Sequence, residues 1–156
     1  MSSRPASHLL PRLAILAIGT LASAAWASDA PVVSDAWARA TPPGTDVGAA
    51  YLVSQGGKQA DRLVGASSER AAMVHLHTVE EQDGVAKMRG IDAVEVPAGQ
   101  RVTLAPKSTH LMLMGLDGPL VAGQSFVMKL RFANAGEQSV TVSVKPATDD
   151  HSQHQH

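Results

Sequence analysis

Short segments that alternate between apolar and polar residues follow one another along most of the chain beyond residue 30. Alternation places every second side chain on one face, as expected for β-strands that are buried on one side. Glycine- or proline-containing turns separate the segments, and helical periodicity is nearly absent. The expected strands cover residues 32–40, 48–54, 61–66, 71–79, 85–89, 93–96, 101–104, 110–116, 125–133 and 139–144.

The spacing of these segments predicts an all-β domain. Nine or ten short strands with frequent turns are typical of an immunoglobulin-like Greek-key β-sandwich or a related barrel. A single helical turn could fit at residues 67–70, but the pattern predicts no longer helix.

Two of the expected strands meet at Asp83-Gly84, a dipeptide that favours a tight β-hairpin. A two-residue turn there pairs Val79 with Met88 and makes His77 the diagonal neighbour of Met88. A four-residue loop ending at Gly84 pairs His77 with Met88 directly. Both registers place this His and Met on one face, within side-chain reach. A three-residue loop would break the relation unless a bulge restored it.

The two ends of the chain depart from the strand pattern. Residues 1–27 combine basic residues, a short apolar run and an A-x-A site at 25–27, which indicates a signal peptide cleaved before Ser28. A membrane anchor is the alternative, but a spanning helix needs about twenty apolar residues, and this run is shorter. Residues 28–146 then form one domain. Residues 147–156 are polar and are expected to be a disordered tail.

Composition excludes several functions. The formal net charge of −1, with acids and bases interspersed, gives no basic face for nucleic acid and no polybasic patch for a membrane. The chain has no cysteine, which removes thiol redox chemistry and the blue-copper ligand set. No segment after the signal peptide is apolar enough to span a bilayer.

Four residues carry the candidate chemistry. His77, Met88, His110 and Met112 are separated by ten, twenty-one and one residues. Imidazole and thioether ligands without a thiol suit Cu(I). From the numbers of His and Met in the chain, a chance match to this pre-set pattern is expected roughly once in two thousand sequences. His110 and Met112 project to the same face of their strand, since positions i and i+2 do so.

At this motif the chain resembles the periplasmic copper chaperones called PCu(A)C, whose copper motif it matches without departure. The resemblance extends over residues 32–144 and includes the segments at 33–44, 48–52, 61–68 and 110–116. It implies a cupredoxin-like β-barrel or sandwich with an exposed Cu(I) site at the four motif residues. It also implies delivery of copper to respiratory haem-copper oxidases during their assembly, often beside Sco-type proteins.

Other His and Met residues have less specific interpretations. His75 shares the face of His77 and is a possible auxiliary ligand. Met73 and Met114 are expected to pack, and Met128 is expected in the core. Trp37 is expected to pack within the sandwich or to shield a Cu(I) site. Three tail histidines are further auxiliary candidates, for Cu(II) rather than Cu(I) because no sulfur accompanies them: His151, His154 and His156.

The sequence therefore predicts a secreted, non-enzymatic and monomeric Cu(I) chaperone of the bacterial periplasm. Its partners would be copper, an oxidase subunit and a Sco-type protein. The first alternative is a copper sequestration or resistance protein that uses the same ligands. The second is an immunoglobulin-like interaction module without metal, whose His and Met residues only pack. A copper oxidase comes last, because two thioethers hold copper reduced.

Overall fold

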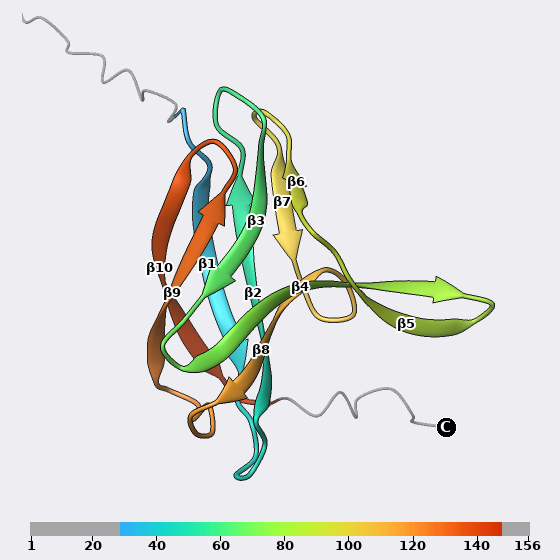
Figure 1. Ribbon diagram of the computed structural model, residues 1–156, viewed down its shortest axis with the longest axis vertical. Coiled ribbons are helices and arrows are strands. Elements are labelled where there is room, and N and C mark those ends of the chain that lie inside the picture. Colours follow the sequence, from blue (N-terminus) through green and yellow to red (C-terminus); the bar gives the residue numbers. More distant parts are fainter. Residues whose placement is uncertain (1–28, 148–156) are drawn as a thin grey trace, which may run out of the picture.

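The computed structural model describes residues 29–147, and this part of the chain is built from β-strands alone (Figure 1). The expected signal peptide and almost all of the expected tail lie outside the described residues. Within them, no helix has the length and apolar character needed to cross a bilayer. The strands are β1 (Val32–Arg39), β2 (Val47–Gln55), β3 (Asp61–Ser67), β4 (Ala71–Gln82), β5 (Val85–Gly90), β6 (Val94–Val96), β7 (Arg101–Leu104), β8 (His110–Leu116), β9 (Ser125–Phe132) and β10 (Gly136–Lys145).

These strands follow the alternating segments closely, with three larger differences. β10 begins at Gly136, three residues earlier than expected, because its pairing with β9 starts there opposite Phe132. β4 continues three residues further than expected, to Gln82, because the hairpin that follows it is tight and keeps its arms paired up to the turn. The segment after β3 forms a turn at Glu69 and Arg70 instead of a helical turn. Only three residues separate β3 from β4, which leaves too little chain for a helix.

Seven of the strands close into a barrel-like sheet. Their order is β4-β8-β2-β1-β10-β9-β3, and β3 returns to β4 where Ala66 lies opposite Val74. β1 runs parallel to β10, whereas the other pairings are antiparallel. β5 extends the sheet beyond β4, β6 extends it beyond β3, and β7 pairs with β2. The all-β expectation is confirmed, in the form of a barrel.

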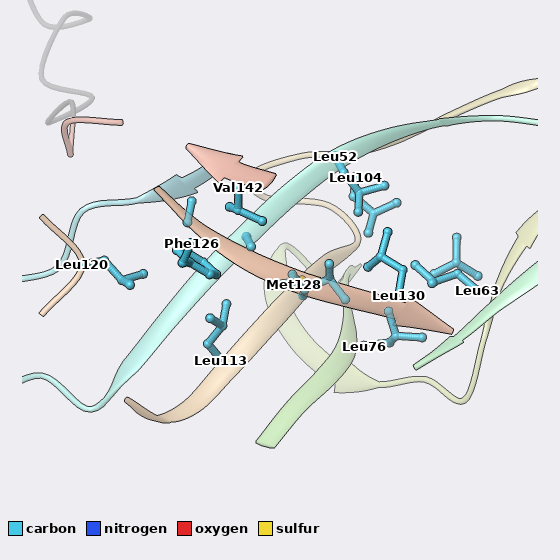
Figure 2. Close-up of a cluster of buried hydrophobic side chains, with 14 of the residues drawn as sticks. Leu52, Leu63, Leu76, Leu104, Leu113, Leu120, Phe126, Met128, Leu130 and Val142 are labelled. Atoms are coloured by element: carbon cyan, nitrogen blue, oxygen red, sulfur yellow. The ribbon is translucent and has the colours of Figure 1, made fainter. Parts of the chain in front are cut away.

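Alternation along the strands fills the barrel with apolar side chains. β9 alternates strictly between exposed and buried residues, and its buried positions include Phe126, Met128 and Leu130. These side chains meet Leu113 and Val142 from other strands in one core cluster (Figure 2). Met128 has no exposed surface, which confirms it as a core residue.

The same alternation leaves a His- and Met-bearing face on the outside of the barrel. In β8, Leu111 and Leu113 belong to the buried core, so His110 and Met112 project from the opposite face. In β4, Leu76 points into the core and His77 therefore points outward. Polar and thioether side chains of two neighbouring strands consequently gather on one outer surface.

A tight turn sets the register of the hairpin between β4 and β5. Asp83 and Gly84 have φ angles of 54° and 74°, as a type I′ turn requires. Gln82 accordingly pairs with Val85, so the two-residue alternative is confirmed. The hairpin projects from the barrel (Figure 1), and every residue of β5 is exposed.

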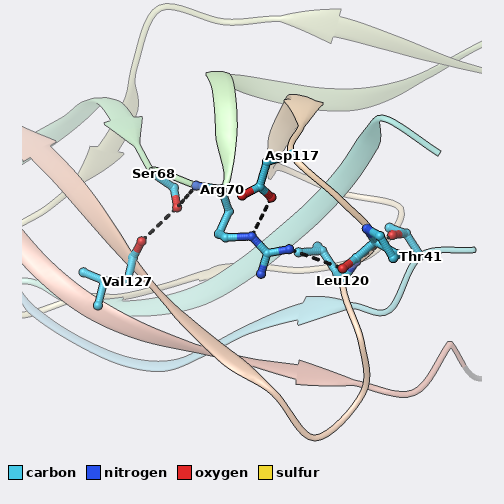
Figure 3. A network of polar contacts seen from close by, with 7 residues as sticks. Thr41, Ser68, Arg70, Asp117, Leu120 and Val127 are labelled. Atoms are coloured by element: carbon cyan, nitrogen blue, oxygen red, sulfur yellow. Dashed lines mark hydrogen bonds and ion pairs between the residues drawn. The ribbon is translucent and has the colours of Figure 1, made fainter. Parts of the chain in front are cut away.

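Polar contacts hold the start of β4 against strand β9 and against the segment that follows β8 (Figure 3). Arg70 Nε donates to Asp117 Oδ1 at 2.7 Å, and a terminal nitrogen of the same guanidinium donates to the Pro119 carbonyl at 3.3 Å. The Ser68 hydroxyl donates to the Val127 carbonyl at 2.8 Å. The strand that carries His77 therefore begins at a position fixed from two sides.

Candidate metal centre

His77 and His110 lie directly opposite each other on β4 and β8. Their ring centroids are 5.9 Å apart and the rings stand nearly perpendicular, at 80°. A direct cross-strand pair has its Cβ atoms about 5 Å apart, so both imidazoles can reach one ion above the sheet. The fold thus brings together two motif residues that are far apart in sequence.

Met88 reaches the same place from the hairpin. It pairs with Val79 in the ladder and is therefore diagonal to His77, as the two-residue turn predicted. Its Sδ lies 3.2 Å from His77 Nδ1. Met88 is 54% exposed, so its thioether is held beside an imidazole at the surface and is not needed to fill the core.

Met112 completes the group from β8. It is the next residue along from His110 on the same face and lies opposite Ala49 of β2 and His75 of β4. It lines an open hollow of about 580 Å³ together with His110, Met88 and Tyr51. The structure therefore gathers all four predicted residues at one shallow surface site.

A backbone carbonyl orients the ring of His110. Its Nδ1 lies 2.9 Å from the Ser108 carbonyl, and because a carbonyl only accepts, Nδ1–H must be the donor. This bond leaves the Nε2 lone pair available for a metal, which is the usual way in which a carbonyl fixes a ligating histidine. His110 is only 5% exposed, so it is the most deeply buried of the four side chains.

The environment of His77 favours its neutral form. Partial burial, followed by the nearby imidazoles of His110 and His75, lowers the pKa of His77. Metal binding needs a neutral imidazole, so protons compete with a metal at His77 less than at an ordinary histidine.

Two aromatic residues flank the site, and the spacing of the four motif residues gives no signal for either of them. Tyr51 lines the hollow with its ring centroid 6.4 Å from that of His110, and Trp37 packs on Tyr51 at 4.5 Å. A bulge in β1 between Ser34 and Trp37 turns Trp37 toward the face of Tyr51. Trp37 is half-buried at the edge of the site and is not in the barrel core.

The donor set decides which metals fit. Nowhere in residues 29–147 do three or more His, Cys, Asp or Glu side chains gather as a metal-binding group. Beside His77 and His110, the donors that the described protein residues offer at this place are the thioether sulfurs of Met88 and Met112. Two neutral imidazoles and two thioethers suit Cu(I) and are a poor match for Mg²⁺ or Ca²⁺, which prefer oxygen.

The structure places the other His and Met candidates that it describes at different distances from the site. His75 is exposed, lies opposite Met112 and has its ring 6.3 Å from that of His77, so it is adjacent to the group. Met73 is 55% exposed, and the expectation that it packs is wrong because position 73 falls on the outer face. His151, His154 and His156 lie outside the described residues.

Sequence comparison places the chain among known proteins. A family model described as "Putative lipoprotein LpqE-like" matches residues 32–144. The "Putative lipoprotein Lxx21020" of Leifsonia xyli subsp. xyli is 37% identical over 120 residues, which cover 76% of this chain and 71% of that protein.

Solved structures show the same fold in copper-bound proteins. The solution structure of the Cu(I) form of DR1885 from Deinococcus radiodurans has a TM-score of 0.65 and 30% identity, over 81% of this chain and 85% of that one. The copper-bound PCuAC domain of PmoF2 has a TM-score of 0.64 and 25% identity, over 77% of this chain and 95% of that domain.

Proposed function

This chain belongs to the LpqE-like, or PCuAC, family, and from that premise we propose that it is a Cu(I)-binding metallochaperone with His77, Met88, His110 and Met112 as ligands. The observation that carries the proposal is the outer-face cluster. Two imidazoles lie directly opposite each other, and one thioether is already 3.2 Å from His77. This pairing of soft and intermediate donors suits Cu(I).

The exposure of the cluster favours a carrier over an enzyme. Met88 is half-exposed and the hollow is open, so an acceptor protein can replace the ligands of Cu(I) one at a time. The thioethers keep copper in its reduced state. The metal is therefore cargo in this proposal, and the protein itself performs no reaction.

We further propose that the cargo goes to the copper sites of respiratory haem-copper oxidases, with an oxidase subunit or a Sco-type protein as acceptor. Resemblance to the PCu(A)C chaperones supports this destination. The monomeric state expected from the sequence suits such a handover, because one open face must serve both for loading and for docking.

The family description and the leader-like segment at residues 1–27 support a location outside the cytoplasm. We propose the periplasm, with residues 28–146 as the copper-binding domain. The 156 residues contain no cysteine, so they offer no thiol for lipid attachment.

An anaerobic Cu(I) titration against a competing chelator tests the binding step. The protein would be the mature chain with His151, His154 and His156 changed to Asn, so that the tail cannot bind copper. We expect one equivalent of Cu(I) to bind tightly, and we expect Met112→Leu to lower the affinity at least about tenfold. An absence of stoichiometric binding would favour the metal-free interaction module.

Deletion of the gene separates delivery from sequestration. Loss of a chaperone lowers oxidase activity when copper is scarce and leaves tolerance of excess copper unchanged. Loss of a sequestration protein has the opposite result. Restoring the wild-type chain and the Met112→Leu variant to the deletion strain links either phenotype to the cluster.

A further inference from the structure

We propose that Met73, His75 and Met114 form a second Cu(I)-binding position on the outer face, next to the four-residue cluster and connected to it through Met112. The inference rests on the proposed function, because it extends the same surface. It assigns a ligand role to three side chains that lie outside the motif.

The register of β4 and β8 places these residues in order. Three successive cross-strand pairs on the outer face are Met73 with Met114, His75 with Met112, and His77 with His110. Neighbouring pairs are two residues, or about 7 Å, apart along the strands. Met112 therefore borders both the His77–His110 pair and the Met73–Met114 pair.

Exposure shows that these side chains are available. Met73 is 55% exposed, His75 is exposed and Met114 is partly buried. Their inward neighbours Val74 and Leu113 pack in or against the core. The barrel is therefore filled without Met73 and Met114, and packing does not account for two adjacent thioethers on its surface.

The distribution of sulfur along the described chain points the same way. Of the five methionines in residues 29–147, only Met128 lies in the core. The other four lie on the outer face of β4, β5 and β8, within a few strand positions of the His77–His110 pair. Leu or Val would serve a purely apolar surface equally well, whereas thioethers add affinity for Cu(I).

Two thioethers and one imidazole can hold Cu(I) with three ligands. This set has one imidazole fewer than the His77–His110 cluster, so we expect it to bind more weakly. Copper can then pass from Met73, His75 and Met114 to the tighter cluster by exchanging one ligand at a time, with Met112 bound throughout the crossing. The ion stays Cu(I), and no electron is transferred.

The mature full-length chain, carboxy-terminal histidines included, provides the test. Its methionine methyl groups are labelled with ¹³C, and Cu(I) alone is added under anaerobic conditions. Cu(I) is diamagnetic, so each methyl remains visible by NMR. We expect the first equivalent to shift Met88 and Met112, and the second to shift Met73 and Met114. The core methyl of Met128 should stay in place as the internal control.

A double variant, Met73→Leu with Met114→Leu, preserves volume and shape and should remove the second set of shifts. In this variant, the Cu(I) concentration at which the methyl signals of Met88 and Met112 shift should stay within about twofold of the wild-type value. His75→Asn should weaken the second step more than the first.

The possible failures are distinguishable. If Met88 and Met112 shift but Met73 and Met114 do not move at two equivalents, the second position is disproved and the proposed function stands. If Met88 and Met112 do not respond either, the proposed function itself fails.

Discussion

Nδ1 of His77 lies 3.2 Å from Sδ of Met88, although eleven sequence positions and a hairpin turn separate the two residues. Because a thioether carries no hydrogen, only the imidazole can donate in this contact. Two side chains that both have lone pairs for a soft metal are thus already in contact, and the exposed arm β5 holds one of them. The affinity for Cu(I) should therefore depend on a residue that contributes little to stability.

Met88→Leu tests whether Cu(I) affinity can be lowered without loss of stability. We expect at least about a tenfold loss of Cu(I) affinity, as is typical of a disturbed metal site, with little change in the free energy of unfolding because Met88 is 54% exposed. The matched control is Met128→Ala in the core, which should cost about 2–5 kcal/mol of stability without changing Cu(I) stoichiometry. Chelator competition and denaturant unfolding measure the two effects. Equal destabilisation by both variants would contradict the expectation.

The turn between β4 and β5 offers a second test. Gly84 has a φ of 74°, which a β-branched residue adopts only at a cost of about 1–2 kcal/mol. Gly84→Val should therefore speed amide exchange along β5 and weaken Cu(I) binding, while the midpoint of barrel unfolding hardly changes. Asp83→Asn is the control, because Asn-Gly suits the same turn. Unchanged exchange in β5 would show that its register does not depend on this turn.

Metal selectivity follows from the donors. With His151, His154 and His156 changed to Asn, we expect calorimetry to detect no tight Zn²⁺ site, because residues 29–147 contain no group of three His, Cys, Asp or Glu side chains that could bind one. Excess Zn²⁺ should likewise fail to displace Cu(I). Stoichiometric Zn²⁺ binding would require a ligand set other than the one proposed.

Asp61 should make stability depend on pH. Burial alone would raise its pKa, but hydrogen bonds from the backbone, Asn134 foremost, outweigh burial and lower it. The bonds from the amides of Arg62, Asn134 and Ala135 are 2.8, 2.9 and 2.9 Å long. A lowered pKa in the folded state stabilises the protein above the unfolded value of about 4. This contribution is lost as the pH falls through the folded value.

Asp61→Asn should therefore cost about 1–3 kcal/mol at pH 7, since at least one backbone donor loses its acceptor. The variant should lose less stability than wild type as the pH falls from about 5 to about 2. Urea unfolding at several pH values measures both effects. A constant difference between the two proteins across this range would exclude Asp61 as the group responsible.

The strands and the position of the hairpin were predictable because they depend on local rules. A period of two assigns residues such as Leu111 and Met112 to opposite faces. Asp83-Gly84 favours a tight turn, and of the two-residue and four-residue registers that it left open the structure adopts the first. These rules also place His77 and Met88 on one face without any knowledge of tertiary contacts. Ligation by these residues remains a prediction.

The long-range pairings were not predictable in the same way. Nothing local in β3 or β4 indicates that Ala66 meets Val74 and closes the barrel, or that β1 runs parallel to β10. The bulge after Ser34 shifts the alternation of β1 by one residue, which is why alternation alone does not place Trp37 beside Tyr51. Packing is the wrong expectation for Met73 because an exposed methionine has the same sequence signal as a packed one.

The parallel pairing of β1 with β10 also determines how the domain would respond to tension. The two strands begin and end the barrel, with Trp37 beside Ser143 and Arg39 beside Lys145. A pull on the two ends of the domain would load this pair in shear, so that several hydrogen bonds must break together. β4, β5 and β8 lie outside that force path. Tension on a tether at either end of the domain would therefore pass mainly through β1 and β10, which carry none of the four motif residues.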